Sequence, residues 1–391
     1  MSNLNVNDTL MTIPLDVIRD ILLQLPAKPL LRFKCVCKSW YNLINDPSFI
    51  RRHVEQSLAT QSNLHFVIRT PMLHLADFDT FDNPVELDYP FKNSSDGGGE
   101  IVGSCNGLFC LWNYDYGLSL FLYNPTTQTH KILPDLPIIA PFSFRLSKFD
   151  IGFGYDNISE DYKCVRILQN HDKEAGSVES EVMVYSLKSD SWRRGPDVPY
   201  YFHYHNGLGN TALLNETVHW VGDNGDRIAL PIVAFNLRDE TFSSIPLPDF
   251  DAQWNAGMFV GVLDGFLCLS VSYVDNFDVW VMKEYGVAAS WTCLFSVDKR
   301  TIIEHLERPI FYSLNRKELF VRICLLKVAA INLETLQIRD VKVAGFHKCV
   351  DAHVCVENLL MLKDVVVDVP VGEENQGQKK SKRRKRRKHR R

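Results

Sequence analysis

The sequence predicts a multidomain α+β chain: a small N-terminal helical domain, an all-β propeller of about six four-stranded blades, and a disordered basic tail. Three observations lead to this fold class. Apolar residues recur at helical spacing over roughly the first fifty residues and then alternate as they do in strands. The strand region repeats with a period of about fifty residues. The last thirteen residues are almost all Lys and Arg.

Composition sets the outer limits. The 391 residues are 46% hydrophobic and 23% charged, which is typical of globular domains and argues against collagen, coiled coil and wholesale disorder. No apolar run reaches the roughly 18 residues that a membrane span needs. The N-terminus lacks a secretion signal. None of the ten cysteines forms a Cys-x-x-Cys pair, so we expect reduced thiols in a reducing compartment, with no metal and no cofactor.

The apolar spacing of the N-terminal region predicts four short helices. Pro14 suits the first turn of the first helix, which ends at Leu25-Pro26 because the residue before a proline avoids the α region. Pro29 is expected to open the second helix, and the third lies around Trp40. Asp46-Pro47 is typical of an N-cap and first turn, and it predicts the fourth helix.

These helices carry about fifteen large apolar side chains, more than a unit of about fifty residues can bury on its own. Two interpretations follow. The helices form a cap that packs on the rest of the chain, or they form an interaction module that buries the excess on a partner.

Four motifs support the second interpretation. They are Ile13-Pro14-Leu15-Asp16-Val17-Ile18, Leu25-Pro26-Ala27-Lys28-Pro29-Leu30, Phe33-Lys34-Cys35-Val36-Cys37-Lys38-Ser39-Trp40 and Asp46-Pro47-Ser48-Phe49. In this order and spacing they resemble an F-box. The resemblance implies docking on the Skp-family adaptor of SCF (Skp–cullin–F-box) ubiquitin ligases, and through it on the cullin and RING subunits.

The resemblance also implies which side chains contact the adaptor. By position they are Ile13, Pro14, Leu15, Ile18, Leu22, Leu25, Pro26, Leu30, Phe33, Val36 and Trp40. Some of these must instead fill the small core of the helical domain. Leu22, Val36 and Trp40 are the candidates for that role.

The strand region begins after residue 63, and one stretch displays its repeating unit. Residues 101–105 are expected to form a strand, and Asn106-Gly107 is a strong hairpin signal because both turn positions favour positive φ. Further strands are expected over residues 108–112, 118–123 and 129–133.

Two marks recur along the region. The first is a hairpin turn at intervals of 50, 59, 49, 51 and 43 residues, near Asn106, Asp156, Asn215, Asp264, Asn315 and Asn358. The second is a bulky pair seven residues apart across the last turn of a unit: Tyr123/His130, Tyr185/Trp192, Phe235/Phe242 and Ile331/Ile338, with Trp291 in the second place of the fourth unit. Four strands per unit at this period indicate a kelch-like β-propeller.

The sixth unit has only two clear strand segments, at residues 350–356 and 358–362. Residues 64–70 and 72–77 are expected to supply the other two. Both chain ends would then share one blade, which closes the ring and leaves no exposed edge. A two-sheet β-sandwich is the alternative.

The strand region also carries a family resemblance. Gly152-Phe153-Gly154-Tyr155-Asp156, followed by Asp161-Tyr162-Lys163-Cys164-Val165-Arg166, resembles the signature of the plant F-box-associated domain. Residues 104–108 and 123–127 fit the same pattern. The units lack the Gly-Gly doublet of ordinary kelch repeats, so they are kelch-like only in a broad sense.

One loop has an unusual composition, Tyr200-Tyr201-Phe202-His203-Tyr204-His205-Asn206. Tyr and His are frequent on recognition surfaces, so Tyr200, Tyr201, His203 and His205 are candidate target-binding residues. A connection packed on its neighbouring blade is an equal alternative. The two histidines lack the further ligands of a metal site. The sequence contains neither a phosphate-binding loop nor a nucleophile elbow, so no catalytic residue is assigned.

The basic tail follows a polar linker. Residues 379–391 hold 11 of the 43 Lys and Arg residues, which leaves an acidic body with 32 basic and 47 acidic side chains. We expect a nuclear import signal read by importin. Nucleic-acid binding, a merely solvated tail, and a tail folded back onto the acidic body are the alternatives. The predicted signal comprises Lys379, Lys380, Lys382, Arg383, Arg384, Lys385, Arg386, Arg387 and Lys388.

The predicted organisation is therefore a flexible N-terminus (1–11), an F-box (12–58), a propeller (62–368) and a linker with basic tail (369–391). The expected function is a non-catalytic substrate-recognition subunit of an SCF ubiquitin ligase in nucleus and cytoplasm, with the propeller binding an unidentified target. The rivals are a nuclear protein- or nucleic-acid-binding scaffold without ligase activity, and a propeller enzyme.

Overall fold

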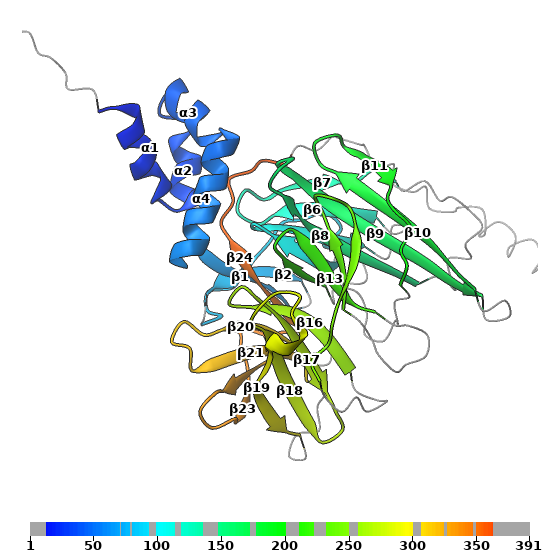
Figure 1. Ribbon diagram of the computed structural model, residues 1–391. Helices are drawn as coiled ribbons and strands as arrows, with labels where there is room; N and C mark the ends of the chain where they lie inside the picture. Colours follow the sequence, from blue (N-terminus) through cyan, green and yellow to red (C-terminus); the bar gives the residue numbers. More distant parts are fainter. Residues whose placement is uncertain are drawn as a thin grey trace, which may run out of the picture.

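The computed structural model describes residues 13–70, 72–78, 80–93, 99–113, 119–135, 148–172, 177–200, 211–222, 232–249, 257–299, 306–323, 327–346 and 349–362. Within these residues, four helices precede six separate four-stranded antiparallel sheets (Figure 1). The predicted helical domain and six-bladed propeller are confirmed, and the sandwich alternative is wrong because the sheets do not merge into two layers.

The helices are α1 (Leu15–Leu23), α2 (Ala27–Phe33), α3 (Lys38–Ile44) and α4 (Pro47–Thr60). The Asp46 side chain caps α4 by accepting from the Ser48 and Phe49 amides, as predicted. The second helix begins at Ala27 rather than at Pro29, because a proline within the first turn removes no helical hydrogen bond. Val36 consequently lies beyond this helix, in the connection to α3.

In every blade the strands run from the central channel outward. Blade 1 is β4 (Glu100–Cys105), β5 (Leu108–Asn113), β6 (Ser119–Asn124) and β7 (Thr129–Ile132); blade 2 is β8 (Lys148–Asp156), β9 (Asp161–Asp172), β10 (Ser177–Ser186) and β11 (Ser191–Arg194); blade 3 is β12 (Ala212–Leu214), β13 (Thr217–Val221), β14 (Ile232–Asn236) and β15 (Phe242–Ile245). Blade 4 is β16 (Gly257–Leu263), β17 (Phe266–Ser272), β18 (Asn276–Met282) and β19 (Trp291–Asp298), with the short η1 (Ala288–Ser290) before β19; blade 5 is β20 (Leu306–Tyr312), β21 (Glu318–Ile323), β22 (Lys327–Asn332) and β23 (Ile338–Asp340); blade 6 is β24 (Asp351–Val356), β1 (Leu64–Arg69), β2 (Leu73–Asp77) and β3 (Val85–Glu86).

Both repeating marks have a structural counterpart. Five of the six predicted hairpin turns join the first strand of a blade to the second. The bulky pairs are directly opposite one another on the third and fourth strands, and Met282 opposes Trp291 in blade 4. Cross-strand pairs of large side chains stabilise a sheet, so the recurring pair reflects a packing need common to these blades.

Blade 6 closes the ring as predicted, because β24 from the C-terminal part pairs with β1 from the N-terminal part. The predicted sixth hairpin at Asn358 is wrong. Residues 358–362 form no strand, and β3 completes the blade instead. Residues 357–362, which we call the C-terminal strap, run between the helical domain and blade 1.

Candidate functional site

The helical domain has a core that includes one residue of the strap. Leu22, Leu30 and Ile44 are 0–1% exposed and belong to the same cluster as Leu359. The sequence predicted Leu22 and Leu30 as adaptor contacts. Both side chains are buried in the helical core, so they do not contact a partner directly but pack beneath the exposed side chains of the helices. The alternative core assignment of Leu22 agrees with this placement.

Apart from Leu58, which lines the channel, six large apolar side chains of the described helical domain are 45–59% exposed. Monomeric proteins rarely leave so many large apolar groups in water without a partner. Figure 1 shows α1, which supplies three of them, on the side of the helical domain away from the propeller. We call this set the apolar helical surface; it comprises Ile13, Leu15, Val17, Ile21, Val36 and Tyr41.

The other predicted contact residues are divided between surface and core. Pro14 and Pro26 are exposed at the starts of α1 and α2. Phe33 and Trp40 are partly buried and meet edge to face with ring centroids 5.6 Å apart. Ile18 and Leu25 are also partly buried against the core. Trp40 was also a candidate for the helical core, and its partial burial agrees in part with that role. Val36 was another candidate, but it is 59% exposed and does not belong to the core.

Sequence reasoning left out three members of the apolar helical surface: Val17, Ile21 and Tyr41. Helical spacing was available as a signal for two of them, because Val17 and Ile21 are four residues apart and lie on one face of α1. Both side chains extend the apolar face of this helix, and the sequence alone does not indicate which edge of that face packs on the core.

The C-terminal strap joins the helical domain to the propeller. Glu357 accepts a hydrogen bond from the Ala27 amide at 2.6 Å through Oε2, and its Oε1 lies 3.2 Å from Nε2 of His65. Burial opposes ionisation of Glu357, but the hydrogen bonds from His65 and Ala27 hold the pKa of this carboxyl below its ordinary value. A charged carboxylate at the N-terminus of α2 is also favourable to the helix dipole.

The same strap is tied to blade 1. Nδ2 of Asn124 donates to the carbonyl oxygens of Asn358 and Leu360 at 3.0 and 2.7 Å, and Nδ2 of Asn358 donates to the Asn106 carbonyl oxygen at 2.6 Å. The Leu362 amide donates to the Thr129 hydroxyl at 3.0 Å. Because one short segment is bonded to both units, the helical domain is held in a defined orientation to the ring.

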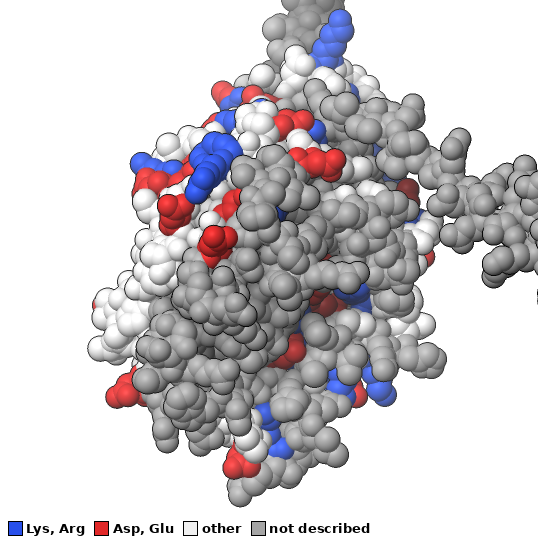
Figure 2. Space-filling model, turned by 90° about the vertical axis from the view of Figure 1, so that its right-hand side faces the viewer, with Lys and Arg blue, Asp and Glu red and all other residues white. Residues whose placement is uncertain are grey.

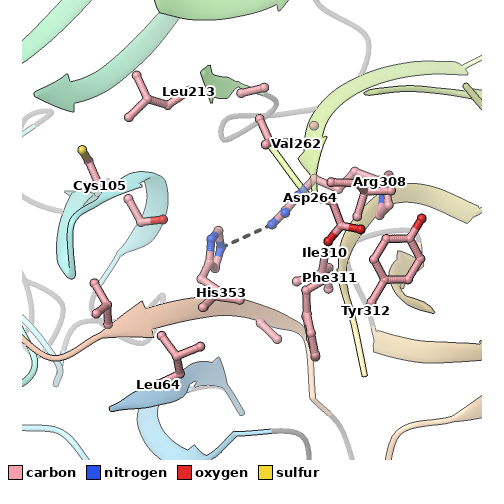
Figure 3. Close-up of a pocket in the computed structure, with 18 of the residues that line it drawn as sticks. Leu64, Cys105, Leu213, Val262, Asp264, Arg308, Ile310, Phe311, Tyr312 and His353 are labelled. Carbon is pink, nitrogen blue, oxygen red and sulfur yellow. Dashed lines mark hydrogen bonds between the residues drawn. The ribbon is translucent and has the colours of Figure 1, made fainter. Parts of the chain in front are cut away.

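The propeller surrounds a central channel. Its walls come from the first strand of every blade, and it encloses a cavity of about 540 Å³ (Figure 3). Leu58 and Gln61, at the end of α4, lie at one mouth beside the hairpin residues Asp264 and Arg316. The helical domain thus sits on the face that carries the turns between first and second strands and between third and fourth strands, and the remaining connections lie on the opposite face.

The predicted target-binding loop begins in the described region. Tyr200 packs partly buried against the core of blades 2 and 3, and its carbonyl accepts from Gln169 at 2.7 Å. Tyr201, His203 and His205 lie outside the described residues. On the side that faces right in Figure 1, the described acidic and basic side chains are interspersed (Figure 2). The charge of this face therefore does not indicate whether a target would be acidic or basic.

A metal site, a membrane-spanning helix and a reactive thiol each place their own requirements on the described residues. No group of three or more His, Cys, Asp or Glu side chains within it could hold a metal ion, and no described helix is long and apolar enough to cross a membrane. The nine described cysteines are free thiols; Cys110 and Cys164 form no disulfide, and their sulfur atoms lie 3.8 Å apart in a thiol–thiol hydrogen bond. Burial raises the pKa of Cys105 to about 12, which leaves that thiol uncharged and a poor nucleophile.

Comparisons with known proteins agree with this architecture. The family model of the F-box domain matches residues 10–52, and that of the F-box associated beta propeller domain matches residues 72–363. F-box protein CPR1 of Arabidopsis thaliana is 34% identical over 373 residues, covering 90% of this chain and 89% of its own length. F-box/kelch-repeat protein At3g23880 of the same plant is 31% identical over 315 residues, covering 77% and 83%. The chain belongs to the F-box proteins that carry an F-box associated β-propeller domain.

Proposed function

We propose that this protein is the substrate-recognition subunit of an SCF ubiquitin ligase. Its helical domain binds a Skp-family adaptor, which connects it to the cullin and RING subunits, and its propeller binds a target protein for ubiquitination and proteasomal degradation. The chain performs no bond chemistry. It raises the effective concentration of the target near the conjugating enzyme, so its contribution is proximity.

The apolar helical surface carries this proposal. Ile13, Leu15 and Val36 are predicted adaptor contacts, and each is at least 45% exposed. Complete burial of such a side chain is worth about 1.5–3 kcal/mol, so burying the exposed half of each on a partner contributes about half of that. The rigid strap adds a second support, because a bound target can be presented in a fixed direction only if the two domains are fixed to each other.

A double substitution tests adaptor binding. Leu15→Asp with Val36→Asp should weaken the complex with a plant Skp adaptor at least about 100-fold, because two apolar contacts become charges. Asp at the first position of α1 suits the helix dipole, so the helix should remain folded. Affinity is measured by calorimetry with purified full-length protein.

Val274→Asp is the matched control, because Val274 is 71% exposed and lies on the propeller. It should bind the adaptor as the wild type does. Equal adaptor affinity for the double variant and the control would refute the assignment. The scaffold alternative is tested separately: if the double variant binds no adaptor and the half-life of a captured target does not change, ligase assembly is not the function.

For residues 379–391 we propose recognition by importin and a distribution between nucleus and cytoplasm. The support is the sequence, with 11 Lys and Arg in the segment. A fluorescent fusion that ends at Gln378 should lose nuclear accumulation and retain adaptor binding. Loss of nucleic-acid binding with unchanged distribution would favour the nucleic-acid alternative, for which a steep salt dependence is expected.

A further inference from the structure

A cluster of buried charged residues lies at one end of the central channel. Arg322 is 3% exposed and Arg308 11% exposed. Both face Asp351 on the neighbouring blade 6, while Glu307 pairs with Arg322 at 2.6 Å. Arg308 is the third residue of β20 and Asp351 the first of β24, which places the cluster toward the mouth opposite the helical domain.

The acceptors in this cluster are already in use. Asp351 accepts from Nη2 of Arg308 at 3.0 Å, from Nη1 of Arg322 at 3.2 Å and from the Ala352 amide at 2.8 Å. Although burial opposes ionisation, Arg308, His353 and Arg322 hold the pKa of Asp351 well below its usual range. Burial lowers the pKa of His353, and its Nε2 lies 3.3 Å from Nη2 of Arg308 and 3.2 Å from Oδ2 of Asp351.

The donors, by contrast, are in excess. Nε of Arg308 and Nη2 of Arg322 are buried without a partner, and Nη1 of Arg308 makes no hydrogen bond to the described part of the chain. Glu100 on blade 1 acts electrostatically on Arg322, and Asp351 is the first of the acidic charges that act on Arg308. A buried guanidinium with unused N–H groups is costly unless an acceptor is supplied.

Arg308 is also directed into the cavity. Figure 3 shows its side chain crossing from β20 toward His353, and both residues line the channel. The cavity wall carries polar as well as apolar groups, but Arg308 itself is only 11% exposed, and shielding from water strengthens a charge-assisted hydrogen bond formed there. Apolar wall residues include Val102, Phe153, Val260, Phe311 and Ala352.

We propose that the channel binds a carboxylate group, with Arg308 as the residue that recognises it. A planar carboxylate supplies the acceptors that the free edge of this guanidinium lacks. The carboxylate belongs either to a small organic acid or to an acidic side chain of the bound target. The second possibility depends on the proposed function, in which the propeller binds a target.

The test uses full-length protein and two pairs of probes. Succinate is compared with succinamide, and a capped pentapeptide with one central aspartate is compared with its asparagine twin, by ligand-observed NMR. Binding of succinate alone identifies a small-acid site, and binding of the aspartate peptide identifies a target contact. If neither acid binds better than its neutral twin, the proposal is wrong.

Variants assign the effect to one residue. Arg308→Gln should weaken binding of the acid at least about tenfold. Arg316→Gln is the matched control, because Arg316 lies at the other mouth of the same channel and is 53% exposed. It should change affinity less than about twofold. Equal effects of the two variants would overturn the role of Arg308.

Arg308→Gln could unfold the ring, because it removes a partner of Asp351. Wild-type crystals soaked with 4-bromobenzoate provide a readout independent of the variant: the anomalous signal of bromine should lie in the channel beside Arg308, and a signal only elsewhere would refute the site. Adaptor affinity is measured in parallel. A protein that binds the adaptor but no carboxylate overturns only the channel proposal, whereas the reverse result overturns only the ligase proposal.

Discussion

The Glu357 carboxylate accepts a hydrogen bond from the Ala27 amide at 2.6 Å, although the two residues are 330 positions apart. Ala27 is the first residue of α2, and Glu357 follows the last strand of the propeller. The contact fixes the beginning of a predicted adaptor-binding helix to the point where the ring closes. The helical domain is therefore completed by the C-terminal part of the chain.

Glu357→Gln should destabilise the protein at neutral pH by about 1 kcal/mol, because a charge-assisted hydrogen bond becomes a neutral one. The folded pKa of Glu357 lies below its ordinary 4.5, so its contribution is present above that value and is lost as the pH falls through the folded pKa. Urea unfolding between pH 7 and pH 3 measures it. The difference between wild type and variant should shrink in acid; a constant difference would contradict the assignment.

Leu359→Ala should destabilise the helical domain by about 2–5 kcal/mol, because Leu359 is fully buried in the helical core. Hydrogen exchange should show lost protection in α1–α4. Met361→Ala is the control two residues further on: Met361 is 47% exposed, and its removal should cost less than about 0.5 kcal/mol. Unchanged protection in the Leu359 variant would show that the helices fold without the strap.

Gly107→Ala and Gly265→Ala compare the same turn position in blades 1 and 4. Both glycines have φ of +77°, so alanine costs about 1–2 kcal/mol at either site. A Cβ at Gly107 would lie 2.0 Å from the Val356 carbonyl oxygen, whereas one at Gly265 would meet nothing within 4 Å. Gly107→Ala should therefore cost at least about 2 kcal/mol more in thermal unfolding. Equal costs would mean that blades 1 and 6 separate easily.

His219 predicts a pH dependence. Its Nδ1 donates to the Ala212 carbonyl at 3.1 Å and its Nε2 accepts from the Tyr285 hydroxyl at 2.7 Å, which suits the neutral ring. Burial lowers its pKa from 6.5 to about 4. The unfolded chain binds the proton first, so stability is lost as the pH falls from about 6.5 to about 4, by on the order of 3 kcal/mol.

The matched variant for this prediction is His219→Gln, which has no titrating ring. Its unfolding free energy, measured by urea at each pH, should fall less steeply than that of the wild type over this range. Parallel profiles would show that His219 is not the titrating group.

Sequence periodicity predicted most of the fold because each blade repeats its own local signals. Asn106-Gly107 predicts a hairpin from two residues, and Tyr123 with His130 predicts a cross-strand pair within one turn. Asn358 misled the sequence interpretation. The Asn is buried and its side chain donates to the Asn106 carbonyl, a contact between distant segments that no local pattern contains.

The helical surface shows the same division. Helical spacing predicts that Leu15, Val17, Ile21 and Leu22 are apolar positions of one helix. Only the packing of α1 against the other helices decides that Leu22 is buried while Val17 and Ile21 are exposed. The family motif therefore identified the surface but not each of its members.

The sequence by itself determined the elements of this protein: four helices, the repeating four-stranded unit and the basic tail, all of which depend on neighbours within a few residues. The tertiary structure alone decided which segments meet. It brings Arg308 beside Asp351 in the channel and Leu359 into the helical core. The physical reason is the sequence distance over which each interaction acts. Turns and periodicity depend on residues close together in the chain, whereas burial and charge pairing depend on which distant segments pack together and exclude water.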